Sequence, residues 1–195
     1  LLPLLWAEGA WAVTCAQTNY SLFTQAEVDA LGASGCDRVL GNVFVGESSD
    51  ITNLDGLGSI TNVGGFLSIY ENAALTNLDG LANLYSVGGE GLNIHRNEAL
   101  TNIDGLANLT IVSGVIWIHF NDALTNLDGL ANLTRVLGDL TIGYNAALTN
   151  LDGLGSITNV GGPLGIYDND ALTNLDGLAN LTSVGDYLTI QNNRF

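Results

Sequence analysis

Apolar residues recur along this chain in a unit that repeats about every 24 residues. The segment Leu/Ile-Thr-Asn-Leu/Ile-Asp-Gly-Leu begins at residues 51, 75, 100, 124, 148 and 172, so successive copies lie 24 or 25 residues apart. The aliphatic positions of one unit are Val63, Leu67, Ile69, Leu75, Leu78, Leu81, Leu84 and Val87. A fixed period of this length is typical of a solenoid, in which each unit forms one coil that stacks on the next.

Each unit contains two aliphatic residues separated by one variable residue, which is the alternation of a strand with one buried face. These pairs are Leu67/Ile69, Leu92/Ile94, Ile116/Ile118, Leu140/Ile142, Leu164/Ile166 and Leu188/Ile190. Stacked coils place them side by side in one parallel sheet. The later leucines are spaced by three, which favours short turns or 3₁₀ segments. The pattern therefore predicts a mainly β fold, a parallel β-helix with about 24 residues per turn.

The residues before the first repeat predict a short helix that covers the open end of the stack. Thr24 and Glu27 have the spacing of a capping box, and Gly32 is a residue type that often ends helices. We therefore expect a helix over residues 25–31. A solenoid needs such a cap because each coil buries its apolar side chains only against its neighbours.

The two cysteines, Cys15 and Cys36, both precede the repeats, and we expect one disulfide that holds an N-terminal cap of residues 13–36. Residues 1–12 are apolar and end in Ala-Trp-Ala, which predicts part of a secretory signal peptide; the alternative is an apolar N-terminal strand. Repeats then fill residues 37–195, where no second cap is evident. We expect a secreted protein whose repeats are truncated at the C-terminus or whose last coil stacks on another molecule.

The charge of the chain is strongly one-sided. Twenty acidic residues stand against four arginines and no lysine, which gives a formal net charge of -16. Nucleic acids and anionic membranes attract proteins mainly through lysine and arginine, so both are excluded as partners. No segment reaches the length of a membrane-spanning helix, and direct membrane insertion is not expected.

Stacking aligns polar residues of the repeat into columns. One column consists of Asn72, Asn97, Asn121, Asn145, Asn169 and Asn193, and another of Asp55, Asp79, Asp104, Asp128, Asp152 and Asp176. We expect the asparagines to bond backbone groups inside the bend. We expect the aspartates to accept backbone N–H bonds as turn or N-cap residues, with calcium bridging between coils as the alternative.

Threonines form a further column, which raises the possibility of ice binding through evenly spaced hydroxyl and methyl groups. Its members are Thr52, Thr76, Thr101, Thr125, Thr149 and Thr173. The alternative interpretation is that β-branched residues suit stacked strands.

The outward strand positions vary from coil to coil, whereas the inward positions barely change. Aromatic residues and histidines gather at these variable positions, at Tyr70, His95, Trp117, His119, Phe120, Tyr144 and Tyr167. Exposed aromatic side chains on a rigid sheet are typical of a binding hot spot. They predict a ligand face for a protein or a glycan, and the alternative is cross-strand pairing that only stabilises the sheet.

Motifs for catalysis or cofactor binding are not recognisable in the sequence. No nucleophile-base set, paired carboxylate cleft, phosphate-binding loop or cysteine-histidine cluster is evident. The two histidines lack a third metal ligand nearby. We therefore expect no enzyme, no cofactor and no metal site.

Cys36, the segment 39–45 and the repeated Leu-Thr-Asn-Leu-Asp-Gly-Leu units with their strand pairs resemble the receptor L domain family. The resemblance covers residues 36–195, and the regular repeats are most similar to those of bacterial and fungal surface proteins. It implies a right-handed β-helix, an extracellular or cell-surface location and ligand recognition. The identity of a ligand does not carry over, because the contact residues of the receptors have no match here.

These observations lead to one principal functional expectation and two alternatives. The principal one is an extracellular binding or adhesion module whose aromatic face contacts its partner. The first alternative is self-association, in which coils stack end to end in a surface layer or filament. The second is an ice-binding protein that uses the threonine column.

Overall fold

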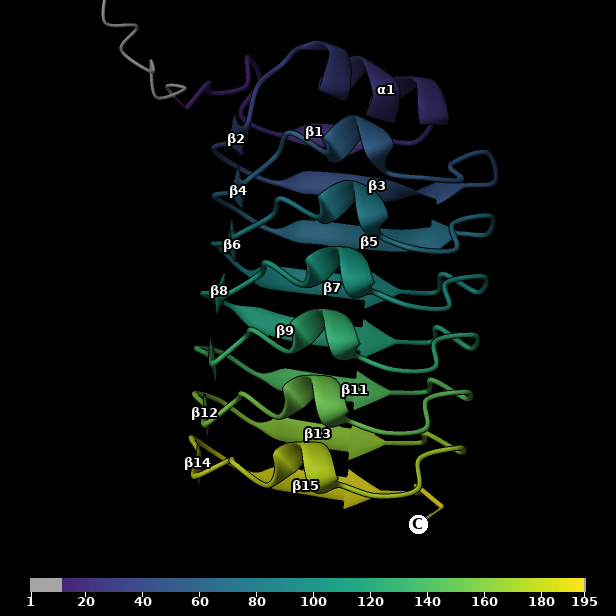
Figure 1. The fold of residues 1–195 in the computed structure, drawn as a ribbon, viewed down its shortest axis with the longest axis vertical. Helices are drawn as coiled ribbons and strands as arrows, with labels where there is room; N and C mark the ends of the chain where they lie inside the picture. The colour runs from purple at the N-terminus through teal and green to yellow at the C-terminus, as the bar shows by residue number, and fades with distance from the viewer. Residues whose placement is uncertain (1–11, 195) are drawn as a thin grey trace, which may run out of the picture.

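The computed structural model describes residues 12–194 of the chain. The coils pile up into a straight stack with a helix at its N-terminal end (Figure 1). Two parallel sheets run along the stack, one of eight strands and one of seven. The mainly β, solenoid-like architecture predicted from the repeat is therefore present.

The eight-stranded sheet, here called the long-strand sheet, lies along one side of the stack. Its strands are β1 (Tyr20–Leu22), β3 (Val43–Ser48), β5 (Leu67–Asn72), β7 (Gly91–His95), β9 (Val115–His119), β11 (Leu140–Gly143), β13 (Leu164–Tyr167) and β15 (Leu188–Gln191). They follow one another in this order, so each strand pairs with the strand of the next coil.

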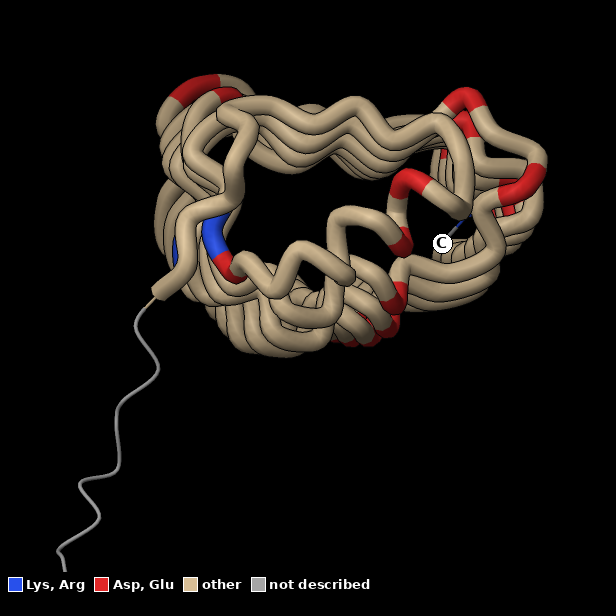
Figure 2. Tube along the Cα trace, turned by 90° about the horizontal axis from the view of Figure 1, so that it is seen from above, with Lys and Arg blue, Asp and Glu red and all other residues tan. Residues whose placement is uncertain are grey.

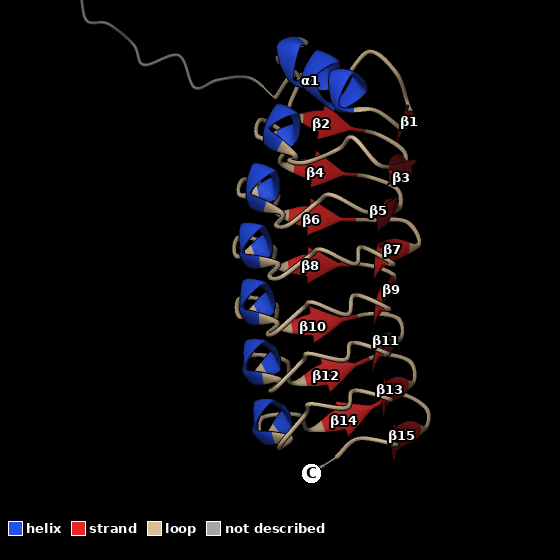
Figure 3. Ribbon diagram, turned by 90° about the vertical axis from the view of Figure 1, so that its right-hand side faces the viewer, coloured by secondary structure: helices blue, strands red, loops and turns tan. Residues whose placement is uncertain are grey.

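The seven-stranded sheet, here called the short-strand sheet, consists of two-residue strands. They are β2 (Arg38–Val39), β4 (Asn62–Val63), β6 (Ser86–Val87), β8 (Ile111–Val112), β10 (Arg135–Val136), β12 (Asn159–Val160) and β14 (Ser183–Val184). Short 3₁₀ turns stack beside it, as Figure 3 shows. They are η1 (Asp55–Leu57), η2 (Asp79–Leu81), η3 (Asp104–Leu106), η4 (Asp128–Leu130), η5 (Asp152–Leu154) and η6 (Asp176–Leu178).

Equivalent residues of neighbouring coils pair directly, which builds aliphatic ladders through the core. Leu140 pairs with Leu164, and Ile142 pairs with Ile166. Nearly all of these inward residues are fully buried, as the alternation predicts. In the last coil of the chain Leu188 and Ile190 are exposed by 54% and 36%.

The helix α1 (Gln25–Ala33) caps the first coil, and its N-terminus is as predicted. The Thr24 side chain accepts the backbone N–H of Glu27, and the Glu27 carboxylate accepts the backbone N–H of Thr24. The predicted end at Gly32 is wrong, because the helix continues to Ala33. Gly32 instead lets the helix approach the Gly56 backbone, where an added Cβ would collide.

The disulfide between Cys15 and Cys36 is present, and the two Cα atoms lie 5.0 Å apart. Both cysteines are buried. The bond joins the segment before β1 to the segment between α1 and β2. The predicted signal peptide, residues 1–12, lies almost wholly outside the described residues. Within those that are described, no helix is long and apolar enough to cross a membrane.

Candidate ligand-binding face

The predicted ligand residues lie on the outward side of the long-strand sheet and just beyond its strand ends. Tyr70 pairs with His95, and His95 pairs with His119. His119 pairs with Gly143, which in turn pairs with Tyr167. Four of the seven predicted residues therefore belong to one column that runs along the stack, and all four are half-buried.

The residue that follows this column in the coils from β3 onward has a left-handed backbone, which was not predicted. These residues are Glu47, Glu71, Arg96, Phe120, Tyr144, Asp168 and Asn192, with φ between 52° and 56°. Asparagine, aspartate and glycine adopt this conformation most readily, and bulky side chains adopt it at a cost. Phe120 and Tyr144 nevertheless occupy it, and these residues are exposed by 41% and 42%.

The rings of three neighbouring coils pack against one another. Phe120 and Tyr144 stack with parallel planes and centroids 4.5 Å apart. The Tyr167 ring lies against Tyr144 at 5.4 Å and against His119 at 5.8 Å, and its hydroxyl oxygen is 3.5 Å from Nε2 of His119. It reaches across Gly143, where any larger side chain would collide with it. The structure thus brings Phe120, Tyr144, Tyr167 and His119 together.

Tyr70 and His95 form a separate stacked pair, with centroids 5.5 Å apart. Arg96 lies between this pair and the larger ring cluster. Its guanidinium carbon is 5.8 Å from the Phe120 ring centroid, and its Nη1 donates to Oε1 of Glu71 at 2.9 Å. All seven predicted residues therefore lie on one face of the stack from β5 to β13, in two groups of contacting rings and with Trp117 in β9, and Arg96 is an additional member of the face.

Two shallow hollows open on this face. The first has a volume of about 320 Å³ and is lined by Asn93, His95, Arg96, Trp117, His119 and Phe120. The second has a volume of about 330 Å³ and is lined by Phe120, Asp122, Tyr144, Ala146, Asp168 and Asp170. The first hollow contains basic and aromatic side chains without a carboxylate, whereas the second combines rings with three carboxylates.

Burial sets the ionisation of the two histidines. It lowers the pKa of His95, with the Arg96 charge adding to the effect, and it also lowers the pKa of His119. Both imidazoles are therefore mainly neutral at pH 7. Burial also raises the pKa of Tyr70 and of Tyr167, so these phenols stay protonated. Arg96 is therefore the one lining residue of the first hollow that carries a full positive charge at pH 7.

The acidic residues gather at corners of the coil and stack into rows along the molecule (Figure 2). One such row is the aspartate column, and its carboxylates are exposed. The prediction that these carboxylates cap the turns is wrong. In each coil the asparagine two residues earlier does so, since its Oδ1 accepts the aspartate N–H at 3.0–3.2 Å. The aspartate itself begins the 3₁₀ turn without a side-chain cap.

The buried asparagine column has the predicted structural role. Nδ2 of Asn121 donates to the carbonyls of Ile94 and His119, and its Oδ1 accepts the backbone N–H of Asn97. The same bonds recur from coil to coil. These amides therefore support the scaffold and are not available to a ligand.

The threonine hydroxyls proposed for ice binding are already occupied. From Thr101 onward each hydroxyl donates to the backbone carbonyl of the threonine in the preceding coil, at 3.1–3.2 Å. Each also accepts from the amide of the asparagine that follows it. This arrangement favours the structural interpretation of the column.

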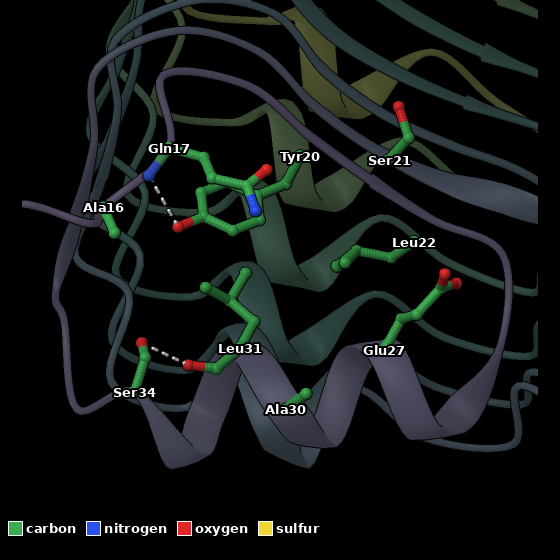
Figure 4. Close-up of a pocket in the computed structure, with 9 residues that line it drawn as sticks. All are labelled: Ala16, Gln17, Tyr20, Ser21, Leu22, Glu27, Ala30, Leu31 and Ser34. Carbon is green, nitrogen blue, oxygen red and sulfur yellow. Dashed lines mark hydrogen bonds between the residues drawn. The ribbon is translucent and has the colours of Figure 1, made fainter.

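A hollow of about 380 Å³ between α1 and the segment before β1 was not predicted (Figure 4). Its main polar groups are engaged locally. The Tyr20 hydroxyl accepts the Gln17 backbone N–H, the Ser34 hydroxyl donates to Leu31, and Glu27 belongs to the capping box. The hollow therefore offers little unused polar chemistry to a ligand. In residues 12–194 no three potential metal ligands come together.

A comparison with protein-family models matches the receptor L domain over residues 35–134, which is just over half of the chain. No curated protein and no solved structure matches this sequence. The matched segment includes β3 to β9 and the first hollow of the aromatic face. The chain belongs to the receptor L domain family.

Proposed function

We propose that this protein is an extracellular recognition module that binds a ligand through the aromatic face of its long-strand sheet. Family membership indicates an extracellular module that binds protein ligands rather than one that catalyses a reaction, and the disulfide agrees with that location. We further infer that the coil is right-handed with about 24 residues per turn. Pairing of residues 24 apart, such as Leu140 with Leu164, supports the second value.

One observation carries the assignment of the face. Phe120 and Tyr144 place exposed aromatic rings at left-handed backbone positions, where Asp168 and Asn192 stand in later coils. The left-handed conformation costs an ordinary residue about 1–2 kcal/mol, which asparagine, aspartate and glycine largely avoid. A ring pair kept at such positions on the surface is better explained by recognition than by stability.

The face is tested by removing its rings without disturbing the core. Trp117 and Phe120 are replaced together by alanine, and binding is measured against a panel of surface proteins and glycans. We expect loss of binding with an unchanged circular-dichroism spectrum. The matched control is Tyr85→Thr, which removes an aromatic residue exposed by 53% next to the short-strand sheet. Unchanged binding by the double variant would contradict the proposal, and a glycan hit in place of a protein would change the ligand class.

A further inference from the structure

We propose that the hollow beside Trp117 receives a single carboxylate side chain of the protein ligand, with Arg96 as its partner and Trp117 as the wall for an adjacent apolar group. The inference rests on the proposed function, because it names the chemistry that one part of the ligand face recognises. It concerns the first hollow, which is lined by residues of β7 and β9 and by the two residues that directly follow these strands.

The hollow differs in charge from the molecule around it. The chain has 20 acidic and four basic residues, yet none of the six lining residues is acidic and one is an arginine. The other polar groups of the lining are the amide of Asn93 and two imidazoles. Nδ2 of Asn93 lies 2.9 Å from Nδ1 of His95, so that ring nitrogen accepts and the ring proton is on Nε2. Arginine and ring N–H groups are donors, and their natural complement is an anionic acceptor.

Arg96 makes two contacts within the protein, and its side chain is 59% exposed. Glu71 accepts one of its N–H groups at 2.9 Å, and the guanidinium lies over the Phe120 ring with 5.8 Å between its carbon and the ring centroid. A guanidinium has five N–H donors, so several stay free for a carboxylate.

Trp117 supplies an apolar wall beside that charge. Its side chain projects from β9, and its neighbours in register are the smaller residues Asn93 and Thr141. The ring therefore stands above its surroundings and is 40% exposed. Within residues 12–194 it makes no ring–ring contact, in contrast to Phe120, so its surface is open to an aliphatic or aromatic side chain of the ligand.

The surroundings limit the ligand to one negative charge at this point. Glu71 and Glu98 line the surface on one side of Arg96. Asp122, Asp168 and Asp170 line the second hollow on the other side. A run of carboxylates on the ligand would meet these groups and be repelled, whereas a lone carboxylate fits between them.

The test compares two capped peptides that differ in one charge, acetyl-Leu-Glu-Leu-amide and acetyl-Leu-Gln-Leu-amide. Each is titrated into the full chain while the indole N–H signal of Trp117 is followed by NMR, with Trp117→Phe to assign that signal. We expect the glutamate peptide to bind about tenfold more tightly, the usual effect of a charge-assisted hydrogen bond. Glucuronate and glucose, titrated in parallel, distinguish a sugar acid from a protein carboxylate.

Three variants test the contributions of Arg96 and Glu71 to the preference for the glutamate peptide. Arg96→Gln should abolish the preference for the glutamate peptide, and Glu71→Gln should increase it, because it removes the competing carboxylate. Arg135→Gln is the matched control, since it removes an exposed arginine of β10 in the short-strand sheet and should change nothing.

The outcomes distinguish this inference from the proposed function. Equal binding of both peptides, lost in a Trp117→Ala variant, would overturn the carboxylate site and leave the ligand face intact. A glutamate preference that survives in Arg96→Gln would overturn the role of Arg96. Binding of glucuronate with no binding of the glutamate peptide would mean that the hollow binds a sugar acid and not a protein carboxylate, which would overturn the inference. No shift of the Trp117 signal with any probe would contradict both the site and the use of the face by such ligands.

Discussion

Each buried asparagine replaces hydrogen bonds that the backbone loses where the long strand ends and the chain turns. Asn121 alone bonds two carbonyls and one backbone N–H, and it joins two coils in doing so. This role was predictable, because a column of identical amides inside an apolar core has few other uses. The role of the aspartate column was not predictable, because Asn77 and Asp79 are both good turn residues. Only the structure shows that Asn77 is the one whose side chain accepts a backbone N–H of the turn.

Replacing Asn121 with alanine should remove its bonds to three buried backbone groups, of which the carbonyl of His119 keeps the backbone N–H of Arg96 as a partner. At about 1 kcal/mol or more for each of the other two, we expect the free energy of unfolding to fall by about 2 kcal/mol. Denaturant titration measures the change. Asn83→Ala is the control, because that exposed amide makes one bond, to the carbonyl of Gly58, and should cost less than about 1 kcal/mol. Equal effects of the two substitutions would contradict the role assigned to the ladder.

The two histidines should make stability depend on pH in mildly acidic solution. Burial lowers the pKa of His95 and His119 below the ordinary histidine value of 6.5. As the pH falls below that value, the unfolded chain takes up protons that the folded chain does not. The free energy of unfolding should therefore decrease until the pH passes the lowered pKa values.

Urea denaturation at pH 7.5 and pH 5.5 measures whether the free energy of unfolding decreases on acidification. The pKa of Glu27 is lowered by its bonds to the backbone of Phe23 and Thr24. Protonation of Glu27 should therefore reduce the free energy of unfolding only below pH 4.5, outside this pH range. A double variant with glutamine at both histidines should lose most of the change between the two pH values. Stability that rises on acidification to pH 5.5 would contradict the burial of these rings.

At the scale of elements, the strands and the cap follow from the sequence, whereas the ends of elements do not. The alternation of Leu67 and Ile69 specified the long strands, and Thr24 with Glu27 specified the start of α1. The left-handed residue near the end of the long strands from β3 onward was missed because unrelated residues such as Arg96 and Phe120 occupy it. The sequence signal that could have found it is the buried asparagine that directly follows.

The 3₁₀ turns stack closely because a glycine stands at their centre. An added Cβ at Gly129 would collide with the carbonyl oxygen of Ile103 in the preceding coil. We expect Gly129→Ala to destabilise the protein by about 1–3 kcal/mol, the usual effect of overpacking. Thermal and denaturant unfolding measure it.

Gly155→Ala is the matched control for this turn. Gly155 follows η5 with φ -60°, and other coils have alanine at the same position, as at Ala131. The substitution should be neutral or stabilise the protein by about 0.4–1 kcal/mol. If both glycine variants behaved alike, the close approach of neighbouring turns would not be what requires Gly129.

At the scale of the whole molecule, acidic residues that stack in rows repel one another along the solenoid. The net charge is -16, and the aspartate column contributes one exposed carboxylate per coil. Salt screens such repulsion over about 10 Å at 0.1 M. We expect the melting temperature to rise when NaCl is increased from about 0.02 to 0.3 M, since net self-repulsion destabilises the compact state. A melting temperature that falls over this range would mean that attractive pairs dominate.

The aromatic face was predictable as a set of residues but not as a surface. Variable outward positions identified Trp117, Phe120 and Tyr144, because a repeat that holds its core constant makes changes elsewhere visible. The packing of Tyr167 across Gly143 onto His119, and the place of Arg96 over Phe120, depend on rotamers that no pattern specifies. Arg96, His119 and Phe120, which take part in that packing, also line the first hollow.

The central claim is that Phe120 and Tyr144 serve recognition at the expense of stability, and the unfolding free energy of a Phe120→Asn, Tyr144→Asn double variant tests it most directly. Asparagine relieves the left-handed backbone cost of about 1–2 kcal/mol per residue, which offsets the lost stacking of about 0.5–1.5 kcal/mol and the lost burial of the covered part of each ring. The variant should be about as stable as the native chain. A loss of more than about 1 kcal/mol would show that the rings stabilise the fold, which would contradict this account.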